Sequence, residues 1–240
     1  MNTKIRLYFS DKIQSDLVAQ LKKEQSHYIK DVMRLKEGDT FSVFNNQGEW
    51  NASVQSYKKQ EAQIKILKKV RDKKYEQNIW LAFTPIKQNP LNFMIQKGTE
   101  LGVQKFVPIL SERTIVKDIN IERIKKIIIE SAEQSNRISI PEIVKIEKLK
   151  NFIFNFPKDG CLVFCDINSN KKNFKNILSK EILGPICILI GPEGDFSENE
   201  RRLIVDLKQS QSISLAKNIL RAETAAITAV SLVNYHLNLS

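Results

Sequence analysis

Several features that mark common functional classes are missing from this chain of 240 residues. It contains neither G-x-G-x-x-G nor G-x-x-x-x-G-K-[ST], the glycine-rich sequences of dinucleotide- and phosphate-binding loops. His27 and His236 are the only two histidines in the sequence. This scarcity excludes a histidine-rich metal site and argues against a Ser-His-Asp triad.

Long apolar segments are missing too. No uncharged apolar run approaches the roughly 18 residues that span a membrane. The first residues, MNTKIRLYFSDK, alternate like a strand and lack the features of a signal peptide. Three cysteines without an export signal indicate a reducing cytoplasm, and Cys161 and Cys165 in the strand-like CLVFC make a poor metal clamp. We therefore expect a cytoplasmic protein without a metal and without membrane contact.

The charge of the chain is strongly positive and unevenly distributed. The formal net charge is +11, and residues 1–74 contribute +7 of it, with 16 Lys and Arg against 9 Asp and Glu. A basic excess in the first third favours a module that binds a polyanion such as nucleic acid. The alternative is a general composition bias, because Lys, Ile and Asn are abundant throughout. Charge alone leaves these two explanations open.

The hydrophobic pattern predicts an α/β protein of two domains. In the first third, short alternating runs predict a small β-barrel with one short helix around EQSHYIKDVMRL. From Ile79 onward, unbroken apolar runs alternate with helical ones, which predicts a parallel sheet covered on both faces. We place the boundary near residue 74, which gives domains at 1–74 and 75–240. The strand-like runs of the first third are IRLYF, TFSVFN, WNASVQSY and AQIKILKKV.

The segment ILIGPEGDFSENE, residues 188–200, leads an apolar strand into a bend shaped by glycine and proline. Ser197 and Glu200 have the spacing of a capping box, so a helix should begin there. A bend of this kind exposes backbone amides, which commonly bind a phosphate. Because the phosphate fingerprints are missing, the residues of the bend by themselves leave its ligand open.

Six segments carry a resemblance to a known family. HYIKDVMRLKEGD, QKGTELGV, SERT, AEQSNR, LIGPEGDFS and ILRAETAA occur in the order and spacing of that family over nearly the whole chain. The chain resembles the ribosomal RNA small-subunit methyltransferase E family, whose members methylate ring nitrogen N3 of a uridine in 16S ribosomal RNA with S-adenosylmethionine. The resemblance implies a PUA-like small β-barrel, then an α/β SPOUT domain with a C-terminal trefoil knot, and a homodimer.

The resemblance also implies where the cofactor binds. S-adenosylmethionine carries no phosphate, and it needs backbone donors and acceptors, apolar walls and room around its sulfonium. Loops at the carboxyl ends of parallel strands can supply these, and the loop after CLVFCD would add a third wall. The expected cofactor-binding residues are Gly191, Pro192, Glu193, Gly194, Leu215, Ala216, Asn218, Ile219 and Leu220.

Three positions depart from the pattern of the family. Asp195 and Ala216 stand where members usually have glycine, and Asn218 stands where they often have arginine. The extra methyl group of Ala216 would be costly if the loop required a positive φ there. These departures bear on individual cofactor contacts.

Arg221, Glu223 and Glu193 are the candidate catalytic residues. With Asn218 as N-cap, Arg221 would lie about three residues into the C-terminal helix, where the macrodipole disfavours a cation by roughly 0.3–1 kcal/mol. An electron-rich substrate would offset that cost. Glu223, Glu193 or water could accept the uracil proton, although an acid near a helix N-terminus is also favoured for structural reasons alone.

Four arginines are candidate RNA contacts. We expect Arg6 and Arg34, in the basic first domain, to contact RNA phosphates or bases, with a solvated surface arginine as the alternative. For Arg113 in SERT and Arg137 in AEQSNR, RNA contact and a structural ion pair are equally open.

The leading prediction is a uridine-N3 methyltransferase of 16S ribosomal RNA that acts on the assembled small subunit. A non-catalytic RNA-binding or ribosome-assembly protein on the same fold is the first alternative, supported by the departures at Asp195 and Ala216. A methyltransferase of a different RNA is the second, because looped RNA is recognised through shape and stacking rather than through a readable code.

Overall fold

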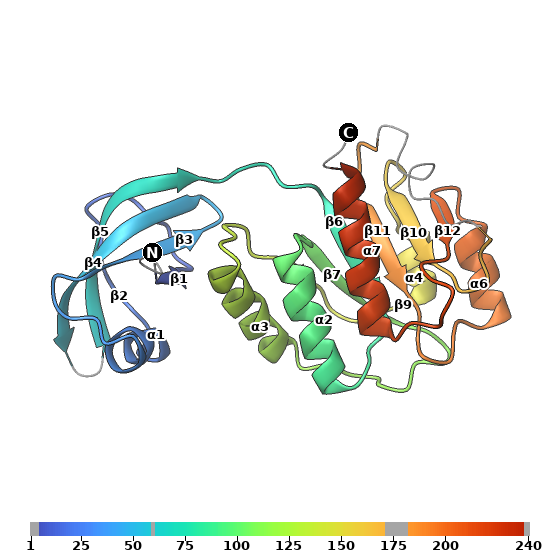
Figure 1. Cartoon of the computed structure of the whole chain (residues 1–240), viewed down its shortest axis with the longest axis horizontal. Helices are drawn as coiled ribbons and strands as arrows, with labels where there is room; N and C mark the ends of the chain where they lie inside the picture. The colour runs from blue at the N-terminus through green and yellow to red at the C-terminus, as the bar shows by residue number, and fades with distance from the viewer. Residues whose placement is uncertain (1–4, 59–60, 171–181, 238–240) are drawn as a thin grey trace. The chain divides into compact units, whose positions relative to one another are not determined.

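The computed structural model describes residues 5–58, 61–170 and 182–237 of the chain (Figure 1). The chain divides into two compact units. The first comprises Met1–Tyr75 and Ala132–Ile140, and the second comprises Glu76–Ser131 and Pro141–Ser240. The first unit therefore includes a short segment from the middle of the chain, which a single boundary near residue 74 would assign to the second domain.

The first unit contains a five-stranded sheet in the order β1-β3-β4-β5-β2. β1 pairs with β3 in parallel, and the other neighbours are antiparallel. The predicted strands are present, but β2 was not predicted, because its three residues carry no apolar alternation. Val43, Ile64 and Ile66 are fully buried in the core of this unit. The strands are β1 (Arg6–Tyr8), β2 (Val18–Gln20), β3 (Thr40–Asn45), β4 (Gly48–Lys58) and β5 (Glu61–Asp72).

The helix predicted in the first unit has two parts. The α-helix α1 (Lys23–His27) continues directly into the π-helix η1 (Tyr28–Val32). A hydrogen bond of 2.9 Å from the Leu35 N–H to the Ile29 carbonyl closes the end of the helix. Arg34, the residue before Leu35, has a left-handed backbone, with φ of 57°.

The second unit contains a seven-stranded sheet in the order β12-β10-β11-β6-β7-β8, with β9 also paired to β7. Every strand pair in it is parallel, so the predicted parallel sheet is confirmed. The strands are β6 (Ile79–Phe83), β7 (Lys105–Leu110), β8 (Glu142–Ile143), β9 (Glu147–Lys148), β10 (Cys161–Cys165), β11 (Ile186–Ile190) and β12 (Ser210–Ile213).

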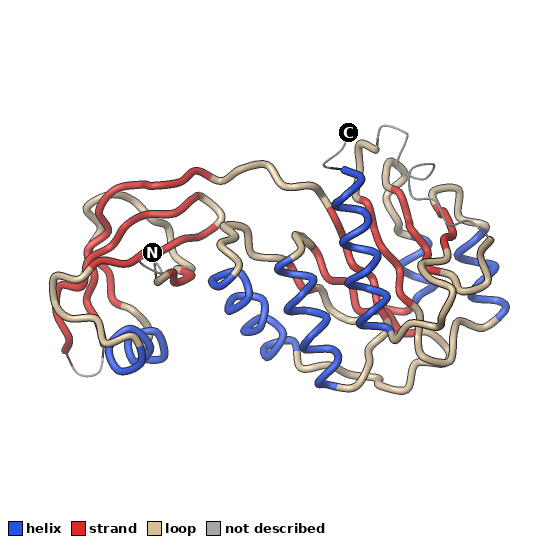
Figure 2. The backbone as a smooth tube through the Cα atoms, viewed as in Figure 1, coloured by secondary structure: helices blue, strands red, loops and turns tan. Residues whose placement is uncertain are grey.

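Helices cover this parallel sheet on both faces (Figures 1 and 2). On one face, α7 packs against α2 and against the central strands β11 and β6. On the other face, α4 and α6 enclose a core that includes Phe164, Leu189 and Phe196. None of the described helices is both long enough and apolar enough to cross a lipid bilayer. The helices are α2 (Gln88–Glu100), α3 (Ile121–Gln134), α4 (Leu149–Phe154), α6 (Glu198–Val205) and α7 (Ala222–Leu237).

Candidate active site at the carboxyl edge of the parallel sheet

The loops expected to bind a cofactor leave the sheet of the second unit at one edge. Gly191 follows β11, Ser214 follows β12 and Asp166 follows β10, all at the carboxyl ends of parallel strands. A hydrogen bond of 2.9 Å from the Asp166 N–H to the Ile213 carbonyl joins the start of the loop after β10 to the end of β12. The carboxyl edge is where open α/β sheets bind their ligands. The structure therefore brings the starts of the predicted cofactor loops to this edge.

The two glycines of the bend after β11 differ in how closely other residues pack around them. A Cβ on Gly191 would lie 2.9 Å from Cε2 of Phe196, so close packing requires glycine at this position. A Cβ on Gly194 would meet nothing closer than 3.8 Å, which is the distance to Cδ of Arg113. Folding therefore does not require glycine at 194, and the exposed backbone there leaves room for a ligand to approach.

Asp195 occupies the left-handed region of the backbone, with φ of 59°. Its N–H donates to the Pro192 carbonyl (2.9 Å), and its Oδ1 accepts from the Phe196 N–H (2.8 Å). Aspartate is one of the few side chains that enter this region, because its short polar group can hydrogen-bond locally. The bend therefore accommodates aspartate where the family pattern has glycine.

Helix α6 begins with the predicted capping box. The Ser197 Oγ accepts from the Glu200 N–H (3.3 Å), and the Glu200 Oε2 accepts from the Ser197 N–H (3.1 Å). The other oxygen, Oε1 of Glu200, accepts from the Glu112 N–H (2.8 Å). The start of α6 thereby also fixes the loop that follows β7.

The loop after β12 presents the second set of expected cofactor residues, positions 215–220. Ile219 is 83% exposed, and Leu215 and Leu220 are half-buried. The φ of Ala216 is not positive, so the cost expected for replacing glycine there does not arise. The loop thus offers apolar side chains and backbone groups to a ligand.

Helix α7 starts later than predicted. Its first residue is Ala222, and the Arg221 carbonyl accepts its first hydrogen bond, from the Ala225 N–H (2.8 Å). Arg221 is therefore the N-cap residue, and the placement of the N-cap at Asn218 was wrong. A cation still lies at the positive end of the helix, without a capping oxygen.

The three predicted catalytic side chains are available for a substrate. Arg221 and Glu193 are exposed, and Glu223 is half-buried in the first turn of α7. Within the described part of the chain, their side chains make no hydrogen bond or ion pair. Among the described residues, no direct contact joins these three side chains.

An ion pair that sequence reasoning missed fixes the loop after β10. Asp166 is 3% exposed, and its Oδ2 accepts from Nη2 of Arg201 on α6 (2.7 Å), which raises the pKa of Arg201. The other oxygen, Oδ1, accepts from the Asn168 N–H (2.9 Å). An aspartate directly after the apolar run CLVFC was the available signal. The ion pair therefore joins α6 to the start of the loop after β10, which is the loop expected to form the third wall of the cofactor site.

The chain is similar to RNA methyltransferases over almost its whole length. A family profile described as an RNA methyltransferase domain matches residues 73–234, and one described as an RNA methyltransferase PUA domain matches residues 21–67. The ribosomal RNA small subunit methyltransferase E of Rickettsia conorii is 32% identical over 95% of this chain and 94% of its own. The chain belongs to the ribosomal RNA small subunit methyltransferase E family.

Two solved structures are similar to the chain over 97% of its length. A ribosomal RNA small subunit methyltransferase E from Neisseria gonorrhoeae, described as bound to S-adenosyl methionine, has a TM-score of 0.85 at 26% identity. A methyltransferase from Legionella pneumophila, described in complex with the cofactor SAM, has a TM-score of 0.85 at 27% identity. In both comparisons, 97% of the known chain is covered as well.

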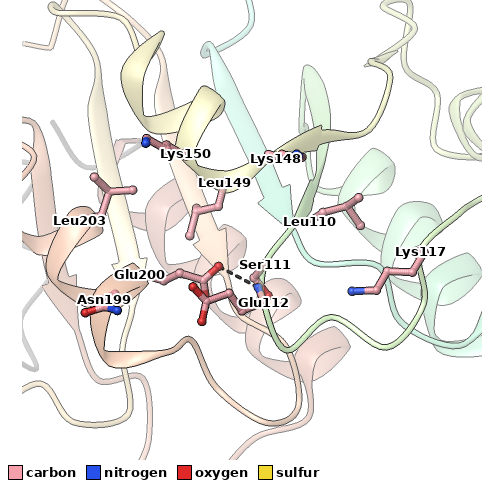
Figure 3. Close-up of a pocket in the computed structure, with 10 residues that line it drawn as sticks. All are labelled: Leu110, Ser111, Glu112, Lys117, Lys148, Leu149, Lys150, Asn199, Glu200 and Leu203. Carbon is pink, nitrogen blue, oxygen red and sulfur yellow. Dashed lines mark hydrogen bonds between the residues drawn. The ribbon is translucent and has the colours of Figure 1, made fainter.

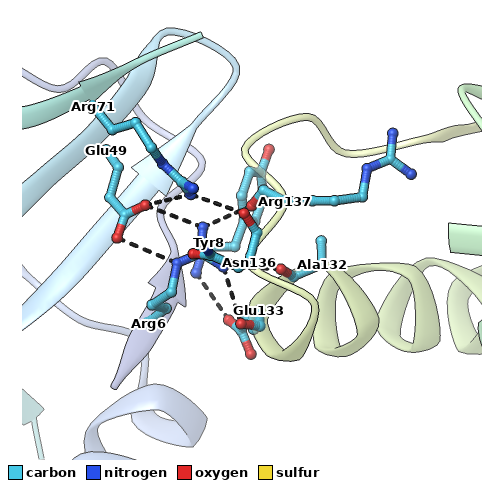
Figure 4. A network of polar contacts seen from close by, with 8 residues as sticks. All are labelled: Arg6, Tyr8, Glu49, Arg71, Ala132, Glu133, Asn136 and Arg137. Carbon is cyan, nitrogen blue, oxygen red and sulfur yellow. Dashed lines mark hydrogen bonds and ion pairs between the residues drawn. The ribbon is translucent and has the colours of Figure 1, made fainter. Parts of the chain in front are cut away.

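The family motif AEQSNR belongs to a polar network in the first unit (Figure 4). Nε and Nη2 of Arg6 donate to the carboxylate of Glu49 (3.2 and 3.3 Å). Nη1 of Arg6 donates to the carbonyls of Ala132 and Glu133 at the end of α3 (both 3.0 Å). Nη2 donates in addition to the Arg137 carbonyl (2.7 Å). All five N–H groups of the guanidinium are therefore used inside the protein.

This network corrects the expectation for Arg6. The residue is 9% exposed and has no donor left for RNA, because Glu49 and the carbonyls at the end of α3 occupy its guanidinium. Burial alone would raise the pKa of Glu49, but the hydrogen bonds and charge of Arg6 outweigh it, so this pKa is lowered. Arg71 adds a second ion pair to Glu49 (2.7 Å).

Of the other predicted RNA contacts in this unit, Arg34 is exposed and Arg137 is buried. Arg137 is 8% exposed, and its Nη2 donates to the Ser139 Oγ (2.8 Å), which favours a structural role. Arg34 keeps an exposed side chain on a backbone with positive φ, a conformation that costs a non-glycine residue energy. Such strain is a common feature of functional positions.

The cysteines of this family member lie in apolar surroundings. Burial raises the pKa of the Cys161 thiol to about 11 and that of Cys187 further, so both thiols stay protonated near neutral pH. Among the residues that the structure describes, no three His, Cys, Asp or Glu side chains are grouped as metal ligands.

Proposed function

We propose that this protein binds S-adenosylmethionine at the carboxyl edge of its parallel sheet and methylates ring nitrogen N3 of a uridine in 16S ribosomal RNA. The proposal is carried by the open space at Gly194 and the exposed loop at 215–220, which both follow carboxyl ends of strands of the parallel sheet. The membership of the chain in this family supports the same assignment. The accommodation of Asp195 and Ala216 removes the reason to prefer a non-catalytic RNA-binding protein.

The residues at this edge suit the cofactor. The backbone of Gly194 can be approached closely, Leu215 and Ile219 offer apolar surface, and the loop backbone offers donors and acceptors for an adenine ring. Once bound, S-adenosylmethionine supplies an activated methyl group. The proposed binding residues remain Gly191, Pro192, Glu193, Gly194, Leu215, Ala216, Asn218, Ile219 and Leu220.

In the proposed reaction, the protein orients the uracil and stabilises the negative charge that the ring acquires when N3 is deprotonated. When N3 loses its proton, negative charge spreads to the flanking carbonyl oxygens. The guanidinium of Arg221, which makes no hydrogen bond or ion pair with the residues that the structure describes, would stabilise that charge as a positioned donor. Glu223, two residues away, is our first choice as proton acceptor, followed by Glu193 and by water.

We assign RNA binding mainly to the first unit. Its net charge of +7 over residues 1–74 and the exposed Arg34 support this assignment. Arg113 in the second unit keeps an exposed guanidinium and remains a candidate RNA contact. The substrate would be the assembled small subunit, which would place the protein in the cytoplasm.

We further propose that the sheet of the first unit forms a PUA-like barrel and that the second unit is a knotted SPOUT domain. The chain order supports the knot, because β12 pairs with β10 before α7 returns to pack on β11 and β6. The composition of α7 supports a homodimer. The helix is mostly apolar around its circumference, but in the described chain its buried residues are Ala226, Ala229, Val230 and Val233. The rest of its apolar surface is left for a second copy of the chain to cover.

Reverse transcription across small-subunit ribosomal RNA tests the function directly. A methyl group on N3 blocks base pairing and stops the polymerase. RNA from a strain that lacks the protein should lose one such stop, and the stop should return when the gene is restored. An unchanged pattern of stops would contradict the proposed function.

A further inference from the structure

A pocket of about 520 Å³ opens beside the candidate active site, and the proposed chemistry gives it no role (Figure 3). Its walls come from the end of β7 and the loop after it, from the start of α4, and from α6. The lining contains three leucines and three lysines beside two acids and two neutral polar residues. The apolar residues are Leu110, Leu149 and Leu203, and the cationic residues are Lys117, Lys148 and Lys150.

The pocket is linked to the active-site bend through the loop that follows β7. Glu200 in the lining accepts the N–H of Glu112 through Oε1 (2.8 Å), which fixes the loop after β7 against α6. The next residue in that loop, Arg113, donates from Nη1 to the Gly194 carbonyl (2.8 Å). The loop after β7 therefore both lines the pocket and contacts the bend.

The charge of the pocket favours an anion. Lys117, Lys148 and Lys150 are exposed, and within the described residues none of the three takes part in an ion pair. Glu200 uses both carboxylate oxygens to accept backbone N–H groups, so its carboxylate already has hydrogen-bond partners in the protein. Glu112 is the other acid in the lining, so among the residues that the structure describes the lining holds three lysines and one carboxylate without an ion-pair partner.

We propose that this pocket binds a nucleotide of the substrate RNA adjacent to the one that is methylated. The lysines neutralise its phosphates, and the leucines pack against its base. The volume lies in the range of about 300–1,000 Å³ that is typical of small-ligand sites. Proteins that read RNA commonly hold such unstacked nucleotides one by one. This inference rests on the proposed function, because it takes the substrate to be RNA.

The test compares two double variants with equal changes of charge. Lys148→Ala with Lys150→Ala alters the pocket. Lys158→Ala with Lys208→Ala is the matched control, because these exposed lysines precede β10 and β12 at the opposite edge of the sheet. Affinity for small subunits from a strain that lacks the protein is measured against salt concentration, and S-adenosylmethionine affinity is measured by calorimetry.

We expect the pocket variant to lose about 1.4–1.8 from its log–log salt slope, at about 0.7–0.9 per phosphate contact. The control variant should keep the parent slope, and all proteins should bind S-adenosylmethionine equally. Lys117→Ala should lose about half as much of the salt slope. Because Lys117 lies in a loop, this variant controls for misfolding of the double variant. Equal slopes for pocket and control variants would overturn the inference, as would a parent without RNA affinity. RNA binding without methyl transfer would instead contradict the proposed function alone.

Discussion

Nη1 of Arg113 donates a hydrogen bond of 2.8 Å to the carbonyl oxygen of Gly194, which lies 81 residues away in the sequence. The contact joins the SERT segment after β7 to the bend after β11, although β6 lies between these two strands in the sheet. Arg113 therefore holds the bend in place through one N–H group. Its exposed position leaves the rest of its guanidinium able to meet a substrate.

The different roles of the two glycines predict different effects of the same substitution. Gly194→Val should abolish S-adenosylmethionine binding while leaving the melting temperature nearly unchanged, because a Cβ there has 3.8 Å of clearance. Gly191→Val should lower the melting temperature, because its Cβ would press on Phe196 at 2.9 Å. Calorimetry with the cofactor and thermal melting separate the two. Normal cofactor affinity in Gly194→Val would show that the site lies elsewhere.

Arg221 and Glu223 predict a graded loss of catalysis. Arg221→Ala should keep S-adenosylmethionine affinity and slow single-turnover methyl transfer by on the order of 10²–10³, the usual effect of losing one preorganised donor. Glu223→Gln should slow transfer less, because water can also take the proton. Assembled small subunits are the substrate for both measurements. An Arg221→Ala enzyme that turns over like the parent would make the arginine structural.

Arg34 predicts a loss of RNA affinity without a loss of fold. Arg34→Gly removes the charge at a position where φ of 57° suits glycine, so the free energy of unfolding should change by less than about 1 kcal/mol. Affinity for small subunits should fall, and the salt slope should drop by about 0.7–0.9 if one phosphate contact is lost. Arg34→Lys is the control that keeps the charge. Equal RNA affinity in the glycine and lysine variants would remove Arg34 from the RNA-binding surface.

The buried pair of Arg6 and Glu49 predicts a pH-dependent contribution to stability. Glu49→Gln leaves Arg6 buried without its counter-charge and should lower the free energy of unfolding by about 3–5 kcal/mol at neutral pH. Glu122→Gln, which breaks the exposed pair with Lys125, should cost less than about 1 kcal/mol. Denaturant unfolding of the three proteins measures both effects.

The sign of the pH effect follows from the lowered pKa of Glu49. A carboxyl group whose pKa is lower in the folded state stabilises the fold above its unfolded pKa, near 4.5, and loses that effect as the pH falls through the folded pKa. The gap between the parent and Glu49→Gln should therefore shrink as the pH is lowered below about 4.5. A gap that stays constant down to about pH 3 would rule out an ionised Glu49 as its source.

The elements that the sequence predicts well are those with a continuous apolar run. KFVPIL and CLVFC coincide with β7 and β10, because strands buried on both faces need apolar residues at every position. The capping box at Ser197 and Glu200 was equally readable, since both partners lie within one helical turn. Local pattern and local geometry agree in these cases.

The parts that could not be predicted depend on contacts between distant residues. The role of Arg6 depends on carbonyls 126 to 131 residues away, which no local pattern encodes. The start of α7 was misplaced because Asn218 is a good N-cap residue, whereas the chain stays irregular until Arg221. The pairing of Asp166 with Arg201 was likewise visible only in three dimensions.

Methylation of isolated small subunits tests whether the protein is a uridine-N3 methyltransferase. Small subunits from a strain that lacks the protein are incubated with the purified protein and methyl-labelled S-adenosylmethionine, and their RNA is digested to nucleosides. We expect labelled 3-methyluridine with the parent protein and on the order of 10²–10³ slower formation with Arg221→Ala. Absence of labelled 3-methyluridine, or a label on another base or another atom of uridine, would contradict the proposed function.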